Sequence, residues 1–298
     1  MNKAISLCAL LGVWTTGTAL AAVPDANLIP GGVAVLSIAP ATTPAPRVTF
    51  QGARVLTLRD NGQWRAVVGL PLSLEPGEQH ITVVHDDQTR QLAFRVKAKR
   101  YESQSLTISN KRLVEPEAED MERINREQAL MTRAFTTWTE PLLDSPRFDA
   151  PSKGPFSARF GLRRFLNKQP RAQHTGLDIA VPEGTPILAP AAGVVIETGN
   201  FFFTGYTVFL DHGQGLVTMY IHLSRVDVVK GVQLKRGEIL GAVGMTGRVT
   251  GPHLHWAVSL NNTRVDPMLF LTPAARAAGE AAASNNALKK PAATPVKP

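Results

Sequence analysis

The segment GPHLHWAVSL, residues 251 to 260, carries two histidines that flank a leucine at the start of an apolar run. Residues at positions i and i+2 of an extended strand point to the same face, so the pattern predicts that His253 and His255 share one side of a strand. Two imidazoles there can simply be the inert polar side of a half-buried strand. They can also serve a metal or a substrate, and the rest of the sequence has to distinguish these readings.

The region around this segment, from about Phe156 to Leu271, is rich in glycine and in short β-type runs. Helical periodicity is almost absent, so we expect a β domain with strands in TPILAP, GVVIETG, YTVFLDHG, LVTMYIHL, EILGAVG and HLHWAVSL. His212 stands between Asp211 and Gly213, a turn pattern, and is expected to be structural. Of the seven histidines in the chain, five lie in this domain: His174, His212, His222, His253 and His255.

A second motif is His174-Thr-Gly-Leu-Asp178. A neutral imidazole and a carboxylate are both zinc ligands, provided that the backbone lets them converge. Gly176 and the following IAVP indicate a loop that enters a strand. Taken alone, the pair is better explained as a loop histidine and a loop aspartate that never meet.

A catalytic zinc takes three protein ligands and keeps one position open for water. His174 and Asp178 would therefore need a third partner from further along the chain. His253 and His255 are the obvious donors, and one can bind the metal while the other faces the same cleft. His222, on a candidate strand between the two motifs, could lean into that cleft.

Several of these segments together resemble the lysostaphin-type (LytM-type) zinc endopeptidases of the bacterial cell wall. They are HTGLDIAVPEGTPILAPAAGVV (174 to 195), MYIHLS (219 to 224) and GRVTGPHLHWAVSLNNTRVDP (247 to 267). The resemblance covers about residues 150 to 271. It implies a compact antiparallel β domain with a groove that cleaves peptide bonds in peptidoglycan. It also implies zinc ligands at His174, Asp178 and His255 and catalytic histidines at His222 and His253.

Other functions remain to be weighed against this one. The sequence has no His-Glu-x-x-His and no Gly-x-Ser-x-Gly, the signatures of the common metalloproteases and of serine hydrolases. Some proteins with this domain have lost ligands and regulate other wall hydrolases, so the alternative is a catalytically silent wall-binding protein that activates another hydrolase. All five positions are filled here, which favours an active endopeptidase. We expect it to cut D-alanyl cross-links and not glycine bridges.

Residues 1 to 22 have the layout of a secretory signal peptide, with Lys3, an apolar run and the small-residue site Ala19-Leu20-Ala21. The single cysteine, Cys8, lies inside this segment, so no disulfide is expected. We therefore expect an exported, periplasmic protein of a Gram-negative bacterium, without a transmembrane anchor. The formal net charge of +8 suits an anionic partner such as a cell-wall polymer, and export argues against nucleic acid.

Residues 23 to 110 contain short alternating runs with turn signals every eight to twelve residues, which predicts a small β-sandwich-like accessory domain. Asp60-Asn61-Gly62 and residues 75 to 78, EPGE, are predicted hairpin turns. His80 and His85 are too far apart in sequence, and too poor in neighbouring ligands, to suggest a metal site. We expect both to lie on the surface.

Residues 111 to 149 form a predicted helical linker, and residues 272 to 298 a disordered tail rich in Ala, Pro and Lys. In the linker, Met121, Ile124, Met131 and Phe135 recur with helical spacing and predict an apolar face that packs on a neighbouring domain. The N-terminal region could restrain the enzyme or target it to the wall. The fold class expected is mainly β: an N-terminal sandwich, a linking helix and a C-terminal antiparallel β domain with a groove.

Overall fold

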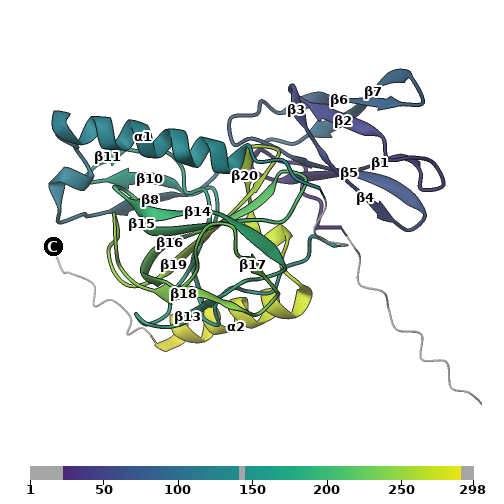
Figure 1. The fold of residues 1–298 in the computed structure, drawn as a ribbon. Helices are drawn as coiled ribbons and strands as arrows, with labels where there is room; N and C mark the ends of the chain where they lie inside the picture. The colour runs from purple at the N-terminus through teal and green to yellow at the C-terminus, as the bar shows by residue number, and fades with distance from the viewer. Residues whose placement is uncertain (1–22, 141–144, 290–298) are drawn as a thin grey trace, which may run out of the picture.

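The computed structural model describes residues 23 to 140 and 145 to 289, arranged as two β-rich domains with two α-helices (Figure 1). The mainly β fold class is thereby confirmed. The predicted signal peptide, residues 1 to 22, lies outside the described residues. In the described part of the chain, no helix is both long enough and apolar enough to cross a membrane.

The N-terminal domain is a sandwich of two antiparallel sheets, as expected. Ile38, Phe50, Trp64, Ile81 and Phe94 are among the buried side chains that fill the space between the sheets. One sheet has the order β1-β5-β4, with β1 at Val33–Pro40, β4 at Leu56–Asp60 and β5 at Gln63–Gly69. The other has the order β3-β2-β6-β7, with β2 at Arg47–Phe50, β3 at Ala53–Arg54, β6 at Gly77–His85 and β7 at Gln88–Val96.

One predicted hairpin turn is confirmed and the other is wrong. Asn61 and Gly62 join β4 to β5 with φ values of 48° and 72°, the left-handed pair that a two-residue hairpin requires. Residues 75 to 78 do not close a hairpin, because β5 and β6 belong to different sheets. The turn after β6 is Asp86-Asp87, again with two positive φ values, which aspartate tolerates better than most residues.

The C-terminal domain is built on one large sheet in which the neighbouring strands are antiparallel. Its main path is β17-β14-β15-β16-β19-β12-β9, with β13, β18 and β20 paired at its margins. Trp256, Tyr220 and Phe148 are fully buried and are the largest side chains of the core on one side of this sheet. The strands are β9 Phe156–Ala158, β12 Leu177–Ile179, β13 Pro186–Leu188, β14 Gly193–Phe201, β15 Gly205–Asp211, β16 Leu216–Val226, β17 Gln233–Leu234, β18 Ile239–Val243, β19 Leu254–Leu260 and β20 Thr263–Val265.

The linker helix α1, Ala118–Phe135, covers the other side of the large sheet (Figure 1). Phe135 contacts Phe209 of β15 edge to face, with ring centroids 5.3 Å apart, in a cluster with side chains of β16 and β19. The predicted apolar face is therefore correct for the C-terminal half of the helix. It is wrong at Met121, which is 44% exposed.

The expectation of a disordered tail after residue 272 is corrected by the helix α2, Pro273–Lys289. Alanine has the highest helix propensity, and a proline at the first position is compatible with a helix. Gly279 of α2 lies so close to Phe156 that a Cβ would come within 2.1 Å of its ring, and Arg276 pairs with Asp25. These contacts order the helix; residues 290 to 298 lie outside the described residues.

Between the two domains, the chain adds a small sheet to the C-terminal domain. β8, Ser103–Leu106, pairs in parallel with β10, Arg163–Leu166, which also pairs with β11, Gln169–Pro170. The side chain of Asn167 then binds the backbone N–H and C=O of Ile108 at 2.8 and 3.0 Å. The short 3-10 helices are η1, Lys111–Leu113, and η2, Pro267–Leu269.

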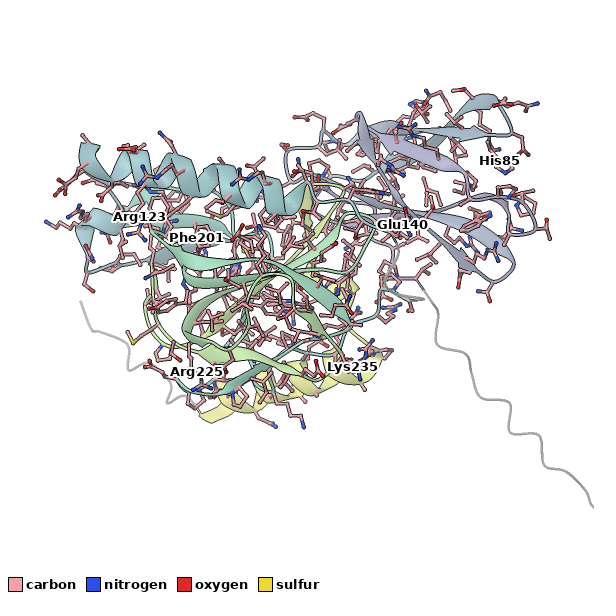
Figure 2. All side chains as sticks on the ribbon, in the orientation of Figure 1. His85, Arg123, Glu140, Phe201, Arg225 and Lys235 are labelled. Carbon is pink, nitrogen blue, oxygen red and sulfur yellow. The ribbon has the colours of Figure 1, made fainter. Side chains whose placement is uncertain are left out.

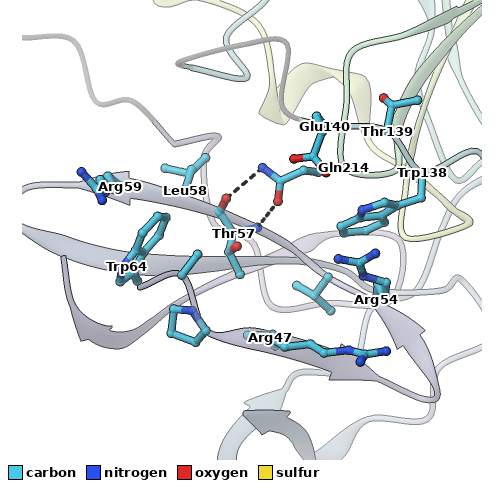
Figure 3. Close-up of a pocket in the computed structure, with 14 residues that line it drawn as sticks. Arg47, Arg54, Thr57, Leu58, Arg59, Trp64, Trp138, Thr139, Glu140 and Gln214 are labelled. Atoms are coloured by element: carbon cyan, nitrogen blue, oxygen red, sulfur yellow. Dashed lines mark hydrogen bonds between the residues drawn. The ribbon is translucent and has the colours of Figure 1, made fainter. Parts of the chain in front are cut away.

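The sandwich also contacts the C-terminal domain directly. Gln214 makes two hydrogen bonds with the backbone of Thr57, and Asn261 accepts one from the backbone N–H of Gly69 at 2.7 Å. Beside this junction lies a hollow of about 720 Å³, in which the guanidinium of Arg54 stacks 4.1 Å from the ring of Trp138 (Figure 3). The two domains therefore share a packed interface in addition to the linker.

Candidate active site

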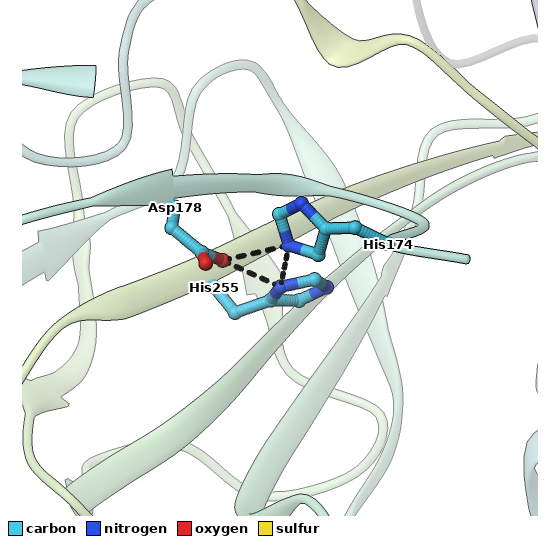
Figure 4. Close-up of side chains that lie close together, drawn as sticks. All are labelled: His174, Asp178 and His255. Carbon is cyan, nitrogen blue, oxygen red and sulfur yellow. Dashed lines mark hydrogen bonds and ion pairs between the residues drawn. The ribbon is translucent and has the colours of Figure 1, made fainter. Parts of the chain in front are cut away.

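The register between β12 and β19 brings the two sequence motifs together. Asp178 of β12 lies directly opposite His255 of β19, and His174 approaches from the loop before β12 (Figure 4). His174 Nε2 and His255 Nδ1 lie 2.9 and 2.7 Å from Asp178 Oδ1, and 2.9 Å from each other. All three side chains are buried. The structure thus assembles the three residues that the resemblance implies as zinc ligands.

The surroundings of His174 and Asp178 orient both groups. His174 Nδ1–H donates to the carbonyl of Arg159 at 2.8 Å, which leaves Nε2 to face the other two side chains. Arg164 donates to Asp178 Oδ2 at 3.1 Å, so the other carboxylate oxygen, Oδ1, faces the histidines. Such outer contacts are how metal-binding side chains are usually held in place.

Gly176 is required for this convergence. A Cβ at this position would lie 2.5 Å from His255 Nε2 and 2.6 Å from the carbonyl of Trp256. Any side chain here would therefore push the loop of His174 away from β19. The glycine in the His-x3-Asp motif has a packing role that the sequence alone did not specify.

The donor set fits a divalent metal. A neutral His174 points an Nε2 lone pair at Asp178 Oδ1 and His255 Nδ1, and three such atoms within 2.9 Å of one another repel unless a proton or a cation lies among them. Two imidazole nitrogens and one carboxylate oxygen form a zinc ligand set. In the part of the chain that the structure describes, this is the group of residues that could hold a metal ion.

The protonation states agree with this fit. Burial raises the pKa of the Asp178 carboxyl, but the adjacent imidazoles of His174 and His255 outweigh it and hold that pKa well below its usual value. Burial also lowers the pKa of His255 to about 4. At neutral pH the aspartate is ionised and His255 is uncharged, which are the forms that bind metal.

His222 and His253 lie beside this cluster. The rings of His222 and His253 are 5.1 Å apart, and that of His222 is 6.2 Å from that of His255. His222 Nδ1–H donates to the carbonyl of Thr246 and His253 Nδ1–H to that of Gly251, both at 2.8 Å. The neutral form of each ring therefore keeps its Nε2 lone pair available for other contacts.

His222 has an unusual backbone for a histidine on a strand. Its φ is 68°, and it lies where the register between β15 and β16 shifts, between the paired residues Tyr220 and Leu223. Burial, together with His253 and His255, lowers the pKa of His222 well below its ordinary value. The bulged strand thus turns a neutral imidazole out of the regular alternation and toward His253 and His255.

A cavity of about 280 Å³ opens onto this cluster and is lined by Asp178, His222 and His253. Sequence analysis did not anticipate several other lining residues. These are Arg164 of β10, Arg248 of the loop before His253, and Gln104, Leu106 and Ile108 of the segment that contains β8. Arg248 stands in the quoted GRVTGPHLH segment, so its closeness to the histidines in sequence was a usable signal. The residues of the β8 segment carried no such signal.

The remaining histidines lie outside the cluster, as expected. His212 is buried; its Nδ1–H donates to the carbonyl of Ala192 at 2.7 Å, and its Nε2 is 2.8 Å from the hydroxyl of Thr218. His80 lies on β6 near Glu78, and His85 lies at the end of β6, away from the C-terminal domain (Figure 2).

His212 gives a prediction for stability against pH. Burial lowers its pKa from 6.5 to about 4, so between these values the unfolded chain binds more protons than the folded one. The free energy of unfolding should be unaffected above pH 7 and should fall by about 2 kcal/mol between pH 7 and 5 through this residue. Urea unfolding of His212→Gln at both pH values, with zinc present, should show a smaller loss than the wild type. An equal loss in both proteins would contradict this role.

Comparison with known proteins places these observations in a family. Peptidase family M23 matches residues 172–267, and the peptidase family M23 N-terminal domain matches residues 27–99. A crystal structure of a Pseudomonas aeruginosa protein assigned to peptidase M23 is 44% identical, with a TM-score of 0.69, over 82% of this chain and 95% of that one. The chain belongs to peptidase family M23. This confirms the family resemblance drawn from the motifs.

Among curated relatives, the peptidoglycan DD-endopeptidase ShyA of Vibrio cholerae is 40% identical over 130 residues, which are 43% of this chain and 30% of that protein. The DD-carboxypeptidase/endopeptidase Mpg of Neisseria meningitidis is 39% identical over 117 residues, 39% of this chain and 27% of that protein. The match to this M23 chain thus spans about a third or less of the length of these relatives.

Proposed function

We propose that this protein is a zinc-dependent endopeptidase that hydrolyses peptide cross-links of bacterial peptidoglycan, with D-alanyl cross-links as its substrate. One observation carries the proposal: His174, Asp178 and His255 converge on one point beside His222 and His253, at the edge of a single cavity. The names of ShyA and Mpg, both enzymes that act on D,D bonds, support the choice of bond.

The roles of the residues follow from their positions. His174, Asp178 and His255 would hold a zinc ion, which would supply Lewis acidity to polarise a peptide carbonyl and to make a water acidic enough to react at neutral pH. His222 and His253 keep Nε2 available because backbone carbonyls hold Nδ1. We assign to these two nitrogens the uptake of the proton of the attacking water and its delivery to the leaving amine. A ring that has taken up the proton presents an Nε2–H, which can donate to the developing oxyanion until the proton passes to the amine.

The alternative function, a silent wall-binding protein that activates another hydrolase, would not need this geometry. Such a protein could lose a ligand or a catalytic histidine without consequence. Here all five side chains are present, and a glycine and an arginine hold the ligands in place. These features support the enzyme over the regulator.

The experiment that tests the function is metal removal. The purified protein should contain one zinc per chain and should digest isolated peptidoglycan sacculi. A chelator should abolish the digestion, and added zinc should restore it, because the three ligands are protein side chains that survive metal removal. Full digestion in excess chelator by protein without metal would overturn the proposal.

We propose the periplasm as the site of action. The predicted signal peptide, residues 1 to 22, would direct export, and the relatives ShyA and Mpg come from Gram-negative bacteria. The substrate proposed above lies in the same compartment. Fractionation of cells that express the full chain should place the processed protein in the periplasmic fraction; a cytoplasmic, unprocessed protein would contradict this location.

We further propose that the N-terminal region regulates the active site through its last segment, residues 103 to 108, which contains β8. Gln104, Leu106 and Ile108 form one wall of the catalytic cavity, and Asn167 fixes this segment through its two bonds to Ile108. Removing the whole N-terminal region would not test this cleanly, since side chains of the sandwich such as Leu58 and Val67 share the core of the C-terminal domain. A point variant is the better probe.

Asn167→Gly should raise the rate of sacculus digestion severalfold. Asn167 has a φ of 49°, so glycine keeps the backbone conformation while it removes the two side-chain hydrogen bonds that tie the wall at Ile108, together about 2 kcal/mol. Lys168→Gly is the matched control, because Lys168 also has a positive φ and is exposed. Slower digestion by Asn167→Gly alone would mean that the wall positions the substrate and does not restrain the enzyme.

A further inference from the structure

The guanidinium of Arg248 is an uncompensated cation in the catalytic cavity. Arg248 lines that cavity together with Asp178, His222 and His253 and is half-buried. Its contacts are a hydrogen bond from Nη1 to the carbonyl of Leu113 at 3.3 Å and stacking 4.6 Å from the ring of Phe203. No carboxylate among the described residues forms an ion pair with it.

The surrounding charges make this arrangement costly without an anion. Burial lowers the pKa of Arg248, and the nearby charges of Arg171 and Arg164 lower it further. The acidic residue that lines the cavity is Asp178, which is already held by Arg164 and by two histidines. A buried charge without a partner is destabilising, so an anion that enters the cavity would relieve this cost.

The position of Arg248 is fixed relative to the catalytic histidines. Its backbone N–H donates to the carbonyl of Phe203 at 2.8 Å, and two residues earlier the carbonyl of Thr246 receives the hydrogen bond of His222. Gly247 between them has a φ of 74°, and a Cβ there would lie 2.5 Å from the backbone nitrogen of Gly205. One short, tightly packed segment thus carries both the cation and the support of His222.

We propose that Arg248 binds a free carboxylate of the substrate, carried on the carbon next to the nitrogen of the scissile amide. This inference rests on the proposed function and deepens it. In a D-alanyl cross-link to a diamino acid such as diaminopimelate, the D-alanyl carbonyl is joined to an amine whose carbon also bears a carboxylate. The terminal D-alanyl-D-alanine of an uncross-linked stem has a carboxylate in the same place, whereas a bond within a polyglycine bridge does not.

The assignment makes Arg248 a specificity-determining residue. The carboxylate would receive charge-assisted hydrogen bonds from the guanidinium, and this would place the neighbouring amide between the metal ligands and the two catalytic histidines. Hydrolysis itself would still consume one water and give a D-alanyl carboxylate and a free amine. Arg248 would bind the substrate and exchange no proton.

The test compares two substrates that differ in one group. One is a cross-linked muropeptide dimer with a free carboxylate next to the scissile nitrogen, and the other is the same dimer with that carboxylate amidated. The wild type should cleave the free form with a kcat/KM on the order of 10- to 100-fold higher. Arg248→Ala should lose this preference by losing activity on the free form, with zinc content unchanged. Arg248→Lys should keep part of it.

Arg163→Ala is the matched control. Arg163 is an exposed arginine on β10, next in sequence to Arg164, and it does not line the cavity. It should keep the full preference. Equal losses on both substrates in Arg248→Ala would mean a merely structural role and would overturn the inference, as would a wild type that cleaves both dimers equally.

A binding measurement separates this inference from the proposed function. The ligand is a muropeptide monomer whose uncross-linked stem ends in D-alanyl-D-alanine with a free carboxylate. In calorimetric titrations of the zinc-loaded proteins, Arg248→Ala should bind this monomer more weakly than the wild type does, whether or not cleavage occurs. Retained carboxylate binding through Arg248 without any cleavage would contradict the endopeptidase function alone. Equal affinity of the two proteins would contradict the role of Arg248 alone.

Discussion

Replacing His255 with alanine is expected to abolish zinc binding and cleavage together. The variant keeps His174 and Asp178, but two protein ligands do not hold a catalytic zinc. Loss of a group that only supports a ligand typically costs 10- to 100-fold in metal affinity or activity, so loss of a ligand itself should cost more. The expected outcome is a protein without stoichiometric zinc and with digestion at background level.

Elemental analysis of the purified variant, together with a digestion assay, measures both quantities. His80→Ala is a suitable control, because His80 lies on the surface of the N-terminal sandwich and should affect neither. His255 is buried, so circular dichroism should first establish that the variant is folded. A folded His255→Ala protein with full zinc content would remove His255 from the ligand set.

Replacing His253 with alanine, or His222 with asparagine, is expected to leave zinc in place while the turnover number falls by about a hundredfold or more. Both residues touch the cavity, and neither lies in the convergent set of ligand atoms. General acid-base catalysis and oxyanion stabilisation each contribute rate factors of this size. Asparagine is chosen at position 222 because the φ of 68° strains alanine more than asparagine.

The same two measurements, zinc content and turnover, separate the histidines of the His-x-His pair. At His253 they should diverge, and at His255 they should fall together. Zinc loss in His253→Ala with zinc retained in His255→Ala would exchange the two roles. Unchanged activity in both variants would mean that the two histidines are inert polar residues on one side of a strand.

The motifs, read together with the family resemblance, predict which side chains meet, but not the backbone geometry that brings them together. His253 and His255 could be placed on one face because strand alternation is local. The meeting of Asp178 with His255 depends on the register between β12 and β19, and the resemblance to a family supplied that step. The orientation of the His222 side chain likewise depends on a bulge in its strand and on a positive φ at this residue, and no local sequence pattern specifies either.

Features outside the motifs were predicted less well, for physical reasons. The wall of the cavity at Leu106 depends on parallel pairing between β8 and β10. These segments are about sixty residues apart in sequence, and neither carries a sequence pattern that predicts the pairing. The alanine-rich segment after residue 272 was expected to be disordered because alanine buries little surface. Its high helix propensity and the docking of Gly279 on Phe156 decide otherwise.

The most direct test of the central claim is mass analysis of the muropeptides released from sacculi that the zinc-loaded wild type has digested. Zinc-dependent cleavage of D-alanyl cross-links predicts that cross-linked dimers disappear and are replaced by monomers, with the addition of one water per bond cut and the glycan chains intact. Cross-links that survive while glycan chains shorten, or a zinc-loaded protein that leaves every muropeptide unchanged, would contradict the account.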